Sequence, residues 1–163
     1  MIQGFTETNI AANISTEDNR IDSTVASTQI RFLVKFINDL DGSIEYCYPE
    51  LTNGIQPRYT RMAFTYYLTN PPSNMFIAGI NLLPSGHWKY EIYEVSWIGN
   101  VVVSSVTAPS SETDVLAVSD TNGVVQGIVT KGILNLTERD GTEQVQYTQH
   151  PEPSGDNFIY YGQ

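Results

Sequence analysis

Few residues of this chain could perform nucleophilic or acid–base chemistry. It contains one cysteine, Cys47, and two histidines, His87 and His150. A thiol nucleophile needs a neighbouring base, and these two histidines are the only imidazole candidates. Cys47 lies in a strand-like run and is better explained as a small, half-buried strand residue. His87 follows a turn and is expected to be exposed, and no Gly-x-Ser-x-Gly elbow occurs. We therefore expect no enzymatic activity.

Three glutamates, Glu45, Glu91 and Glu94, lie in strand-like runs. Two of them could face one another across strands, as the paired carboxylates of a glycosidase do. Single carboxylates on a solvent-facing side of the strands explain them better. A phosphate-binding loop is not indicated, because Gly79 and Gly86 do not precede a helical pattern. No cofactor is expected.

The metal-binding patterns are incomplete. A structural zinc site needs clustered cysteines and histidines, which one cysteine and two distant histidines cannot supply. Asp39, Asp41 and Gly42 match half of a calcium loop, but residues without carboxylates stand where its first and last ligands belong. A hairpin turn is therefore expected at this point. A calcium site built across loops from Asp114 or Asp120 stays an alternative without positive support.

The overall charge excludes one class of partner. The 163 residues carry 8 Lys and Arg against 18 Asp and Glu, a formal net charge of −10, and no basic run occurs. Such a surface repels phosphate backbones, so nucleic acid is not expected as a partner. The first residues have no basic or apolar region of a signal peptide, and no stretch approaches the ~20 apolar residues of a membrane helix. We expect a soluble chain that is made in the cytoplasm.

The aromatic residues are the unusual part of the composition, with 10 Tyr and 2 Trp that lie mostly in strand-like runs. Trp88 and Tyr90 are expected to fill the core. For five other tyrosines, both a core position and a contact surface for a protein or a glycan stay open: Tyr46, Tyr48, Tyr66, Tyr67 and Tyr93.

The elements that would hold these residues are strands. Alternation of apolar and polar residues with a period of two predicts strands at 29–36, 43–48, 59–67, 74–83, 87–98, 101–106 and 143–149, and a strand pair or one bent strand at 124–137. The apolar parity changes within 87–98, which predicts a β-bulge near Tyr93 and Glu94. A long polar connection is expected at 108–123. Short strands joined by Gly, Pro, Asn and Asp indicate an all-β antiparallel sandwich.

Three regions follow from this pattern. Residues 1–28 are expected to be an N-terminal arm, 29–137 the β-sandwich, and 138–163 a C-terminal hairpin with an aromatic extension. The arm has sparse apolar residues and no clear periodicity. The core of the sandwich is expected to contain eight residues: Phe32, Val34, Phe36, Phe64, Ile80, Trp88, Tyr90 and Ile92.

Three stretches carry a resemblance to a known group of proteins. They are Thr-Arg-Met-Ala-Phe-Thr-Tyr at 60–66, Asn-Leu-Leu-Pro-Ser-Gly-His-Trp-Lys-Tyr-Glu-Ile-Tyr-Glu at 81–94, and Phe-Ile-Tyr-Tyr-Gly-Gln at 158–163. Together they resemble small structural proteins of tailed bacteriophages, including crAss-like and marine phages. The similarity covers roughly residues 29–163 and consists of strand and turn motifs.

The resemblance implies an Ig-like β-sandwich in the virion, without catalytic residues to carry over. The implied role is a capsid auxiliary or decoration protein, with the major capsid protein and other copies of the chain as partners. A neck or tail protein of the virion, or a glycan-binding adhesion module, are the alternatives.

The two ends of the chain are the expected contact regions. Four bulky residues follow one another at 158–161, and a single strand face cannot bury all of them. We therefore expect the partner contacts at Phe5, Phe158, Tyr160 and Tyr161. On this interpretation, removal of residues 1–28 leaves a folded domain that no longer enters particles.

Overall fold

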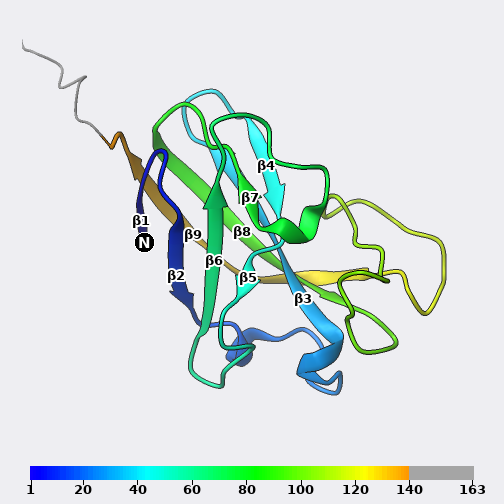
Figure 1. Ribbon diagram of the computed structural model, residues 1–163. Helices are drawn as coiled ribbons and strands as arrows, with labels where there is room; N and C mark the ends of the chain where they lie inside the picture. The colour runs from blue at the N-terminus through cyan, green and yellow to red at the C-terminus, as the bar shows by residue number, and fades with distance from the viewer. Residues whose placement is uncertain (140–163) are drawn as a thin grey trace, which may run out of the picture.

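The computed structural model describes residues 1–139, which fold into two facing β-sheets (Figure 1). One sheet has the strand order β1-β9-β8-β3-β4, and the other has the order β2-β6-β5, with β7 paired to β6. The strands are β1 (Ile2–Phe5), β2 (Ile10–Ile14), β3 (Ile30–Asn38), β4 (Ile44–Cys47), β5 (Glu50–Leu51), β6 (Thr60–Tyr66), β7 (Gly79–Ile80), β8 (Gly86–Ser96) and β9 (Val124–Thr137). The expected all-β sandwich is therefore confirmed.

The core lies between the two sheets. All eight residues expected there are buried, and they join side chains from both sheets in one apolar cluster. Phe36 of β3 meets Phe64 of β6 edge-on, with ring centroids 5.5 Å apart. Such an aromatic contact between the sheets adds to the stabilisation that comes from apolar burial alone.

The N-terminal residues are part of this sandwich, so the expected arm at 1–28 is wrong. β1 pairs in parallel with β9, and β2 pairs in antiparallel fashion with β6. Ile10, Ala12 and Ile14 are buried, whereas the alternate residues of β2 are exposed. This alternation is only five residues long and contains a small alanine, so its apolar signal is weak. The sandwich begins at Ile2 rather than at residue 29.

A bulge was expected in β8, and the pairing of β8 is irregular at that point. The extra residues, however, lie in the neighbouring strand β9. Its pairing with β9 shifts register between Ile92 and Tyr93 and between Glu94 and Val95, while its pairing with β3 continues without a shift. The apolar residues change from even-numbered to odd-numbered positions because both faces of β8 are buried beyond Ile92. The inner face meets the core, and the outer face meets a second apolar cluster.

Other expected strands are shorter than the pattern indicated. The 74–83 region forms a 3-10 turn, η3 (Met75–Ile77), followed by the two residues of β7. Residues 101–106 form no strand, and β9 is one continuous strand of 14 residues. The other helical turns of residues 1–139 are η1 (Glu17–Asn19) and η2 (Ser27–Gln29). No helix in this part of the chain is long and apolar enough to cross a membrane. The expected strand at 143–149 lies outside the described residues.

Candidate interaction surface

The two described residues with nucleophile or base chemistry lie in different environments. Cys47 ends β4 and is fully buried in the core, not half-buried as expected. Desolvation, helped by the negative charge of Glu45, raises the pKa of the Cys47 thiol well above its ordinary value. His87 is exposed near the start of β8, as expected. The thiol is thus held in its protonated form, which is the unreactive one. His150 lies outside the described residues.

The three glutamates do not form a facing pair. Cross-strand neighbours share a face, so Glu91 lies on the outer face with Lys35, whereas Glu94 lies on the inner face with Phe32. The Glu91 carboxylate accepts a hydrogen bond from the Tyr93 hydroxyl at 2.7 Å. Glu45 is half-buried, and desolvation raises the pKa of its carboxyl group. The expectation that all three stand on a solvent face is wrong for Glu94, which is 0 % exposed, and for Glu45, which pairs with the core residue Phe36.

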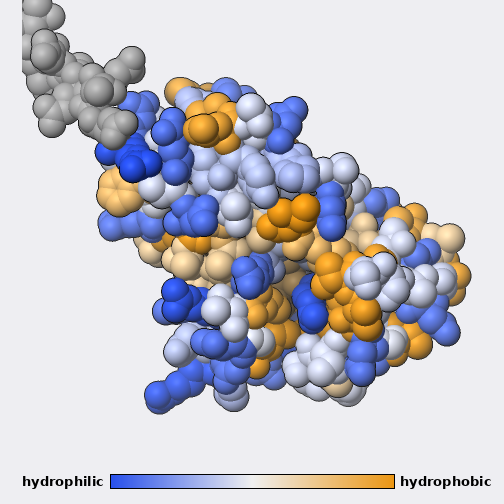
Figure 2. Space-filling view, in the orientation of Figure 1, coloured by the Kyte–Doolittle hydropathy of each residue, from blue (hydrophilic) through white to orange (hydrophobic). Residues whose placement is uncertain are grey.

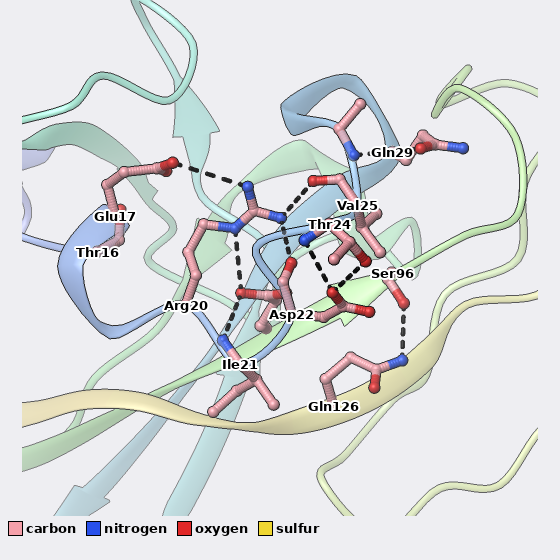
Figure 3. Close-up of polar contacts among 12 residues, drawn as sticks. Thr16, Glu17, Arg20, Ile21, Asp22, Thr24, Val25, Gln29, Ser96 and Gln126 are labelled. Carbon is pink, nitrogen blue, oxygen red and sulfur yellow. Dashed lines mark hydrogen bonds and ion pairs between the residues drawn. The ribbon is translucent and has the colours of Figure 1, made fainter.

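Glu94 is held by Arg20, which comes from the connection between β2 and β3. Arg20 Nε lies 3.5 Å from Glu94 Oε2, and the backbone N–H of Ile21 donates to the same oxygen at 3.2 Å. Figure 3 shows the Arg20 guanidinium at the centre of these contacts, where it also donates to the carbonyl oxygens of Asp22 and Val25. This group fixes the connection against the lower end of the sandwich in Figure 1, so its role is structural.

No group of three or more potential metal ligands occurs among residues 1–139. The expected turn after β3 is confirmed: Asn38 Oδ1 accepts from the N–H groups of Leu40 and Asp41. Asp39 forms an ion pair with Lys89 at 2.5 Å, and Gly42 takes the positive φ that the hairpin requires. The carboxylates of this turn are therefore occupied by the turn and its neighbour.

Residues 97–123, which connect β8 to β9, lie over the outer face of the larger sheet; we call them the covering segment. Beneath it lies the second apolar cluster, built on Leu33, Tyr48, Tyr93 and Val95, which Trp97 joins from the start of the segment. In Figure 1 the segment forms the yellow-green loops on the right side of the sheets. It was expected to be a return strand and a polar connection, but it forms a second layer on this sheet.

Three side-chain contacts attach the covering segment to residues of the larger sheet and its β4 end, and a fourth, from Trp97, lies within the segment. The Trp97 indole donates to the Thr107 carbonyl at 3.1 Å, and the Tyr48 hydroxyl donates to the Pro109 carbonyl at 2.9 Å. The Glu112 carboxylate accepts hydrogen bonds from the Lys35 ammonium and from the Tyr46 hydroxyl, each at 2.5 Å. Because these contacts fix its inner side, the covering segment presents a defined outer side.

That outer side exposes aliphatic side chains. Val115 and Val118 are almost completely exposed, and four more branched residues are about half exposed or more. We call the six the aliphatic surface: Ile98, Val102, Val103, Val115, Val118 and Val124. Figure 2 shows hydrophobic residues gathered at this end of the molecule. Single exposed aliphatic residues are common, but several on one segment and the adjoining start of β9 are typical of a contact site.

A groove of about 530 Å³ lies beside the covering segment. Its walls include Leu51 and Ile55 from one side, Phe76 from η3, and Val101 and Val103 from the covering segment. It is visible as the hollow in the lower half of Figure 2. Arg31, on the outer face of β3, contributes a cation to this mostly apolar groove.

The aromatic residues favour the core interpretation. Trp88, Trp97, Tyr48, Tyr90 and Tyr93 are buried, and Tyr46, Tyr66 and Tyr67 are partly buried. Tyr59 is the one exposed tyrosine of residues 1–139.

Of the four expected anchors, Phe5 is 54 % exposed at the end of the edge strand β1, where it is accessible for contact. Phe158, Tyr160 and Tyr161 lie outside the described residues.

Sequence reasoning missed the aliphatic surface. The available signal was the run Val101-Val102-Val103, together with Val115 and Val118, in a segment otherwise rich in Ser and Thr. Comparison of the chain with family models, with curated proteins and with solved structures gives no match.

Proposed function

We propose that this chain is a non-enzymatic structural component that works through contacts with other proteins, and that its assembly is the virion of a tailed phage. The aliphatic surface carries the first part of the proposal. Five of its six side chains stand on a segment whose inner side is fixed to the sheet by the contacts of Glu112 with Lys35 and Tyr46 and by the Tyr48 hydroxyl, and Val124 adjoins them at the start of β9. A protein partner that covers these side chains would gain the free energy of apolar burial.

The environments of the reactive groups support the absence of catalysis. Cys47 is buried with a raised thiol pKa, and Glu94 is occupied by Arg20. An active site brings a nucleophile or a paired acid and base into one accessible cleft. The described groups are instead distributed between the core, the outer face and the exposed strand ends.

The virion part of the proposal comes from the sequence resemblance to small phage structural proteins. A capsid auxiliary or decoration protein is our first choice of position, with the major capsid protein as partner; a neck or tail position uses the same kind of contact. A glycan-binding module has less support. It would use exposed aromatic rings as a platform, and Trp88 and Trp97 are both buried.

Particles test this proposal directly. Virions of a phage whose genome encodes the chain would be purified on a density gradient. The amount of the chain relative to the major capsid protein would then be measured by mass spectrometry. A fixed stoichiometry that survives a high-salt wash supports a structural component. Absence from the particles contradicts the proposal, and labelling by antibody in electron microscopy separates the capsid, neck and tail positions.

A further inference from the structure

The groove beside the covering segment holds a cation that no carboxylate neutralises within residues 1–139. The Arg31 guanidinium forms no ion pair with a described carboxylate, and its one described hydrogen bond is to the Ile30 carbonyl at 2.7 Å. A guanidinium has five donors, so most remain for a ligand. Partial burial lowers the pKa of Arg31, but an arginine stays charged at any physiological pH.

The walls around this cation are mostly apolar, with Ser27, Thr28 and Asn100 as neutral polar residues among them. Leu51 and Ile55 line one side, and Phe76, Val101 and Val103 line the other. Glu50 is the single carboxylate among the lining residues, and it lies beyond ion-pair distance of Arg31. A fitting occupant is therefore a short segment with bulky apolar side chains and a nearby carboxylate.

The chain itself contains such a segment. Residues 140–163 carry four carboxylates, at Asp140, Glu143, Glu152 and Asp156, and no Lys or Arg. Asp156 is followed after one residue by Phe158-Ile159-Tyr160-Tyr161. The acidic and aromatic composition of this segment complements the cation and the apolar walls of the groove.

The position at which residues 140–163 begin favours binding of this segment to the groove of another copy, not to the groove of its own copy. The described chain ends at Arg139, whose N–H donates to Thr6 Oγ1. The groove lies at the opposite end of β9, because Val124 pairs with Ser96 and the Val101 N–H bonds to Thr28, which lines the groove. The 14 residues of β9 separate the two ends by roughly 45 Å. Residues 140–163 can extend about 80 Å, and a neighbour stacked end to end requires no return over their own domain.

We propose that the groove around Arg31 binds the acidic, aromatic segment 151–163 of a second copy of this chain. The groove and the segment are different surfaces, so the contact is head-to-tail and each copy can both give and receive a segment. This inference rests on the proposed function only because it takes the chain to be a component of a larger assembly. It adds a contact between copies to the contact that the aliphatic surface would make with other proteins.

Two matched full-length variants test the contact. In the groove variant Arg31→Gln removes the cation, and in the segment variant Phe158→Ala/Tyr160→Ala/Tyr161→Ala removes the aromatic side chains. Sedimentation velocity over a range of concentrations should show self-association of the unchanged protein and a loss of about tenfold or more in affinity for each variant. An equimolar mixture of the variants should then form 1:1 dimers, because the segment variant keeps an intact groove and the groove variant keeps an intact segment.

Controls separate the contact from effects on folding. Val103→Asp places a negative charge at an exposed position of the groove wall and should reproduce the effect of Arg31→Gln, so a folding defect of the latter leaves the test intact. Glu50→Gln removes the carboxylate that opposes an acidic segment and should leave association unchanged or tighter. An unchanged protein that is monomeric at all concentrations, variants that associate normally, or a mixture that stays monomeric would each overturn the proposal. Presence in purified particles is measured independently, so the proposed function and this contact can fail separately.

Discussion

The Arg20 guanidinium lies against the Glu94 carboxylate inside the protein, with 3.5 Å between Nε and Oε2. The side chain of Glu94 is 0 % exposed and that of Arg20 is 5 % exposed. The other Glu94 oxygen has no hydrogen-bond partner among the described residues. Each charge is therefore desolvated. Glu94 has Arg20 as its one cation among the described residues, whereas Arg20 also pairs with Glu17 and donates to two carbonyl oxygens.

Arg20→Met should lower the free energy of unfolding by about 3–5 kcal/mol, because it leaves the buried Glu94 carboxylate without its cation. Urea unfolding followed by tryptophan fluorescence measures the change. The double variant Arg20→Met/Glu94→Leu should be less destabilised than the single variant, since both charges are gone. A cost below about 1 kcal/mol for the single variant would contradict a paired buried charge.

The N-terminal strands give the second prediction. Ile10→Ala removes a buried side chain of β2 and should cost about 2–5 kcal/mol in unfolding free energy. Asn13→Ala changes an exposed residue of the same strand and should stay within about 0.5 kcal/mol. Equal effects of the two substitutions would contradict the position of β2 in the sandwich. Deletion of residues 1–28 should unfold the protein, because it removes a strand from each sheet.

The sequence pattern predicted the central strands correctly, but it did not predict elements at the edges of the sheets, such as β2. Nine residues of period-two alternation make β3 recognisable, and its inward side chains were identified correctly. β2 has the same alternation over five residues, with an alanine at its centre, and its burial depends on pairing with β6 more than 45 residues later. A pattern this short does not identify a strand by itself; it does so only when the tertiary contact with β6 is known.

The position of Glu94 was available in the sequence but was assigned to the wrong face. It shares the parity of Trp88, Tyr90 and Ile92, all of which point inward. It was nevertheless grouped with Glu91, which has the opposite parity, on a solvent face. The expected bulge lies in the pairing with β9, where the register shifts add residues to β9. The covering segment could not be predicted in this way, because its structure depends on long-range contacts such as those of Glu112 with Lys35 and Tyr46.

Gly132 gives the third prediction. It pairs with Tyr90, and a Cβ atom at Gly132 would lie 2.6 Å from Cζ of the Tyr90 ring. Gly132→Ala should therefore cost about 1–3 kcal/mol, because the buried ring must shift. Gly99→Ala is the matched control, since a Cβ there meets nothing within 4 Å. Thermal and urea unfolding of the two variants should differ clearly, and equal stabilities would show that Tyr90 does not cover Gly132.

The aliphatic surface gives the fourth prediction. Val115→Asp/Val118→Asp changes two exposed side chains and should leave the free energy of unfolding within about 1 kcal/mol of the unchanged protein. The same variant should enter particles less efficiently, because its partner would have to bury two carboxylates. Leu40→Asp, on the exposed turn after β3, is the control outside this surface and should enter normally. Normal incorporation of the double variant would place the contacts elsewhere.

The buried Cys47 thiol gives the last prediction, on the pH dependence of stability. Its pKa is raised in the folded state, so between the unfolded value of about 8.5 and the folded value the unfolded chain releases a proton that the folded chain keeps. Stability is therefore fully present below about pH 8.5 and is lost as the pH rises above it, by about 1.4 kcal/mol at pH 9.5 from this group. Burial also raises the pKa of Tyr48 and Tyr93, which extends the loss above about pH 10.

Cys47→Val replaces the thiol with an apolar side chain that cannot ionise, and it should remove the first part of this alkaline loss. Urea unfolding at several pH values between about 7 and 10 measures both proteins. A thiol reagent provides an independent reading: Cys47 should react slowly in the folded protein and rapidly in urea, because the thiolate forms only after exposure. Fast reaction in the folded state at neutral pH would mean that the thiol is accessible and that its burial is wrong.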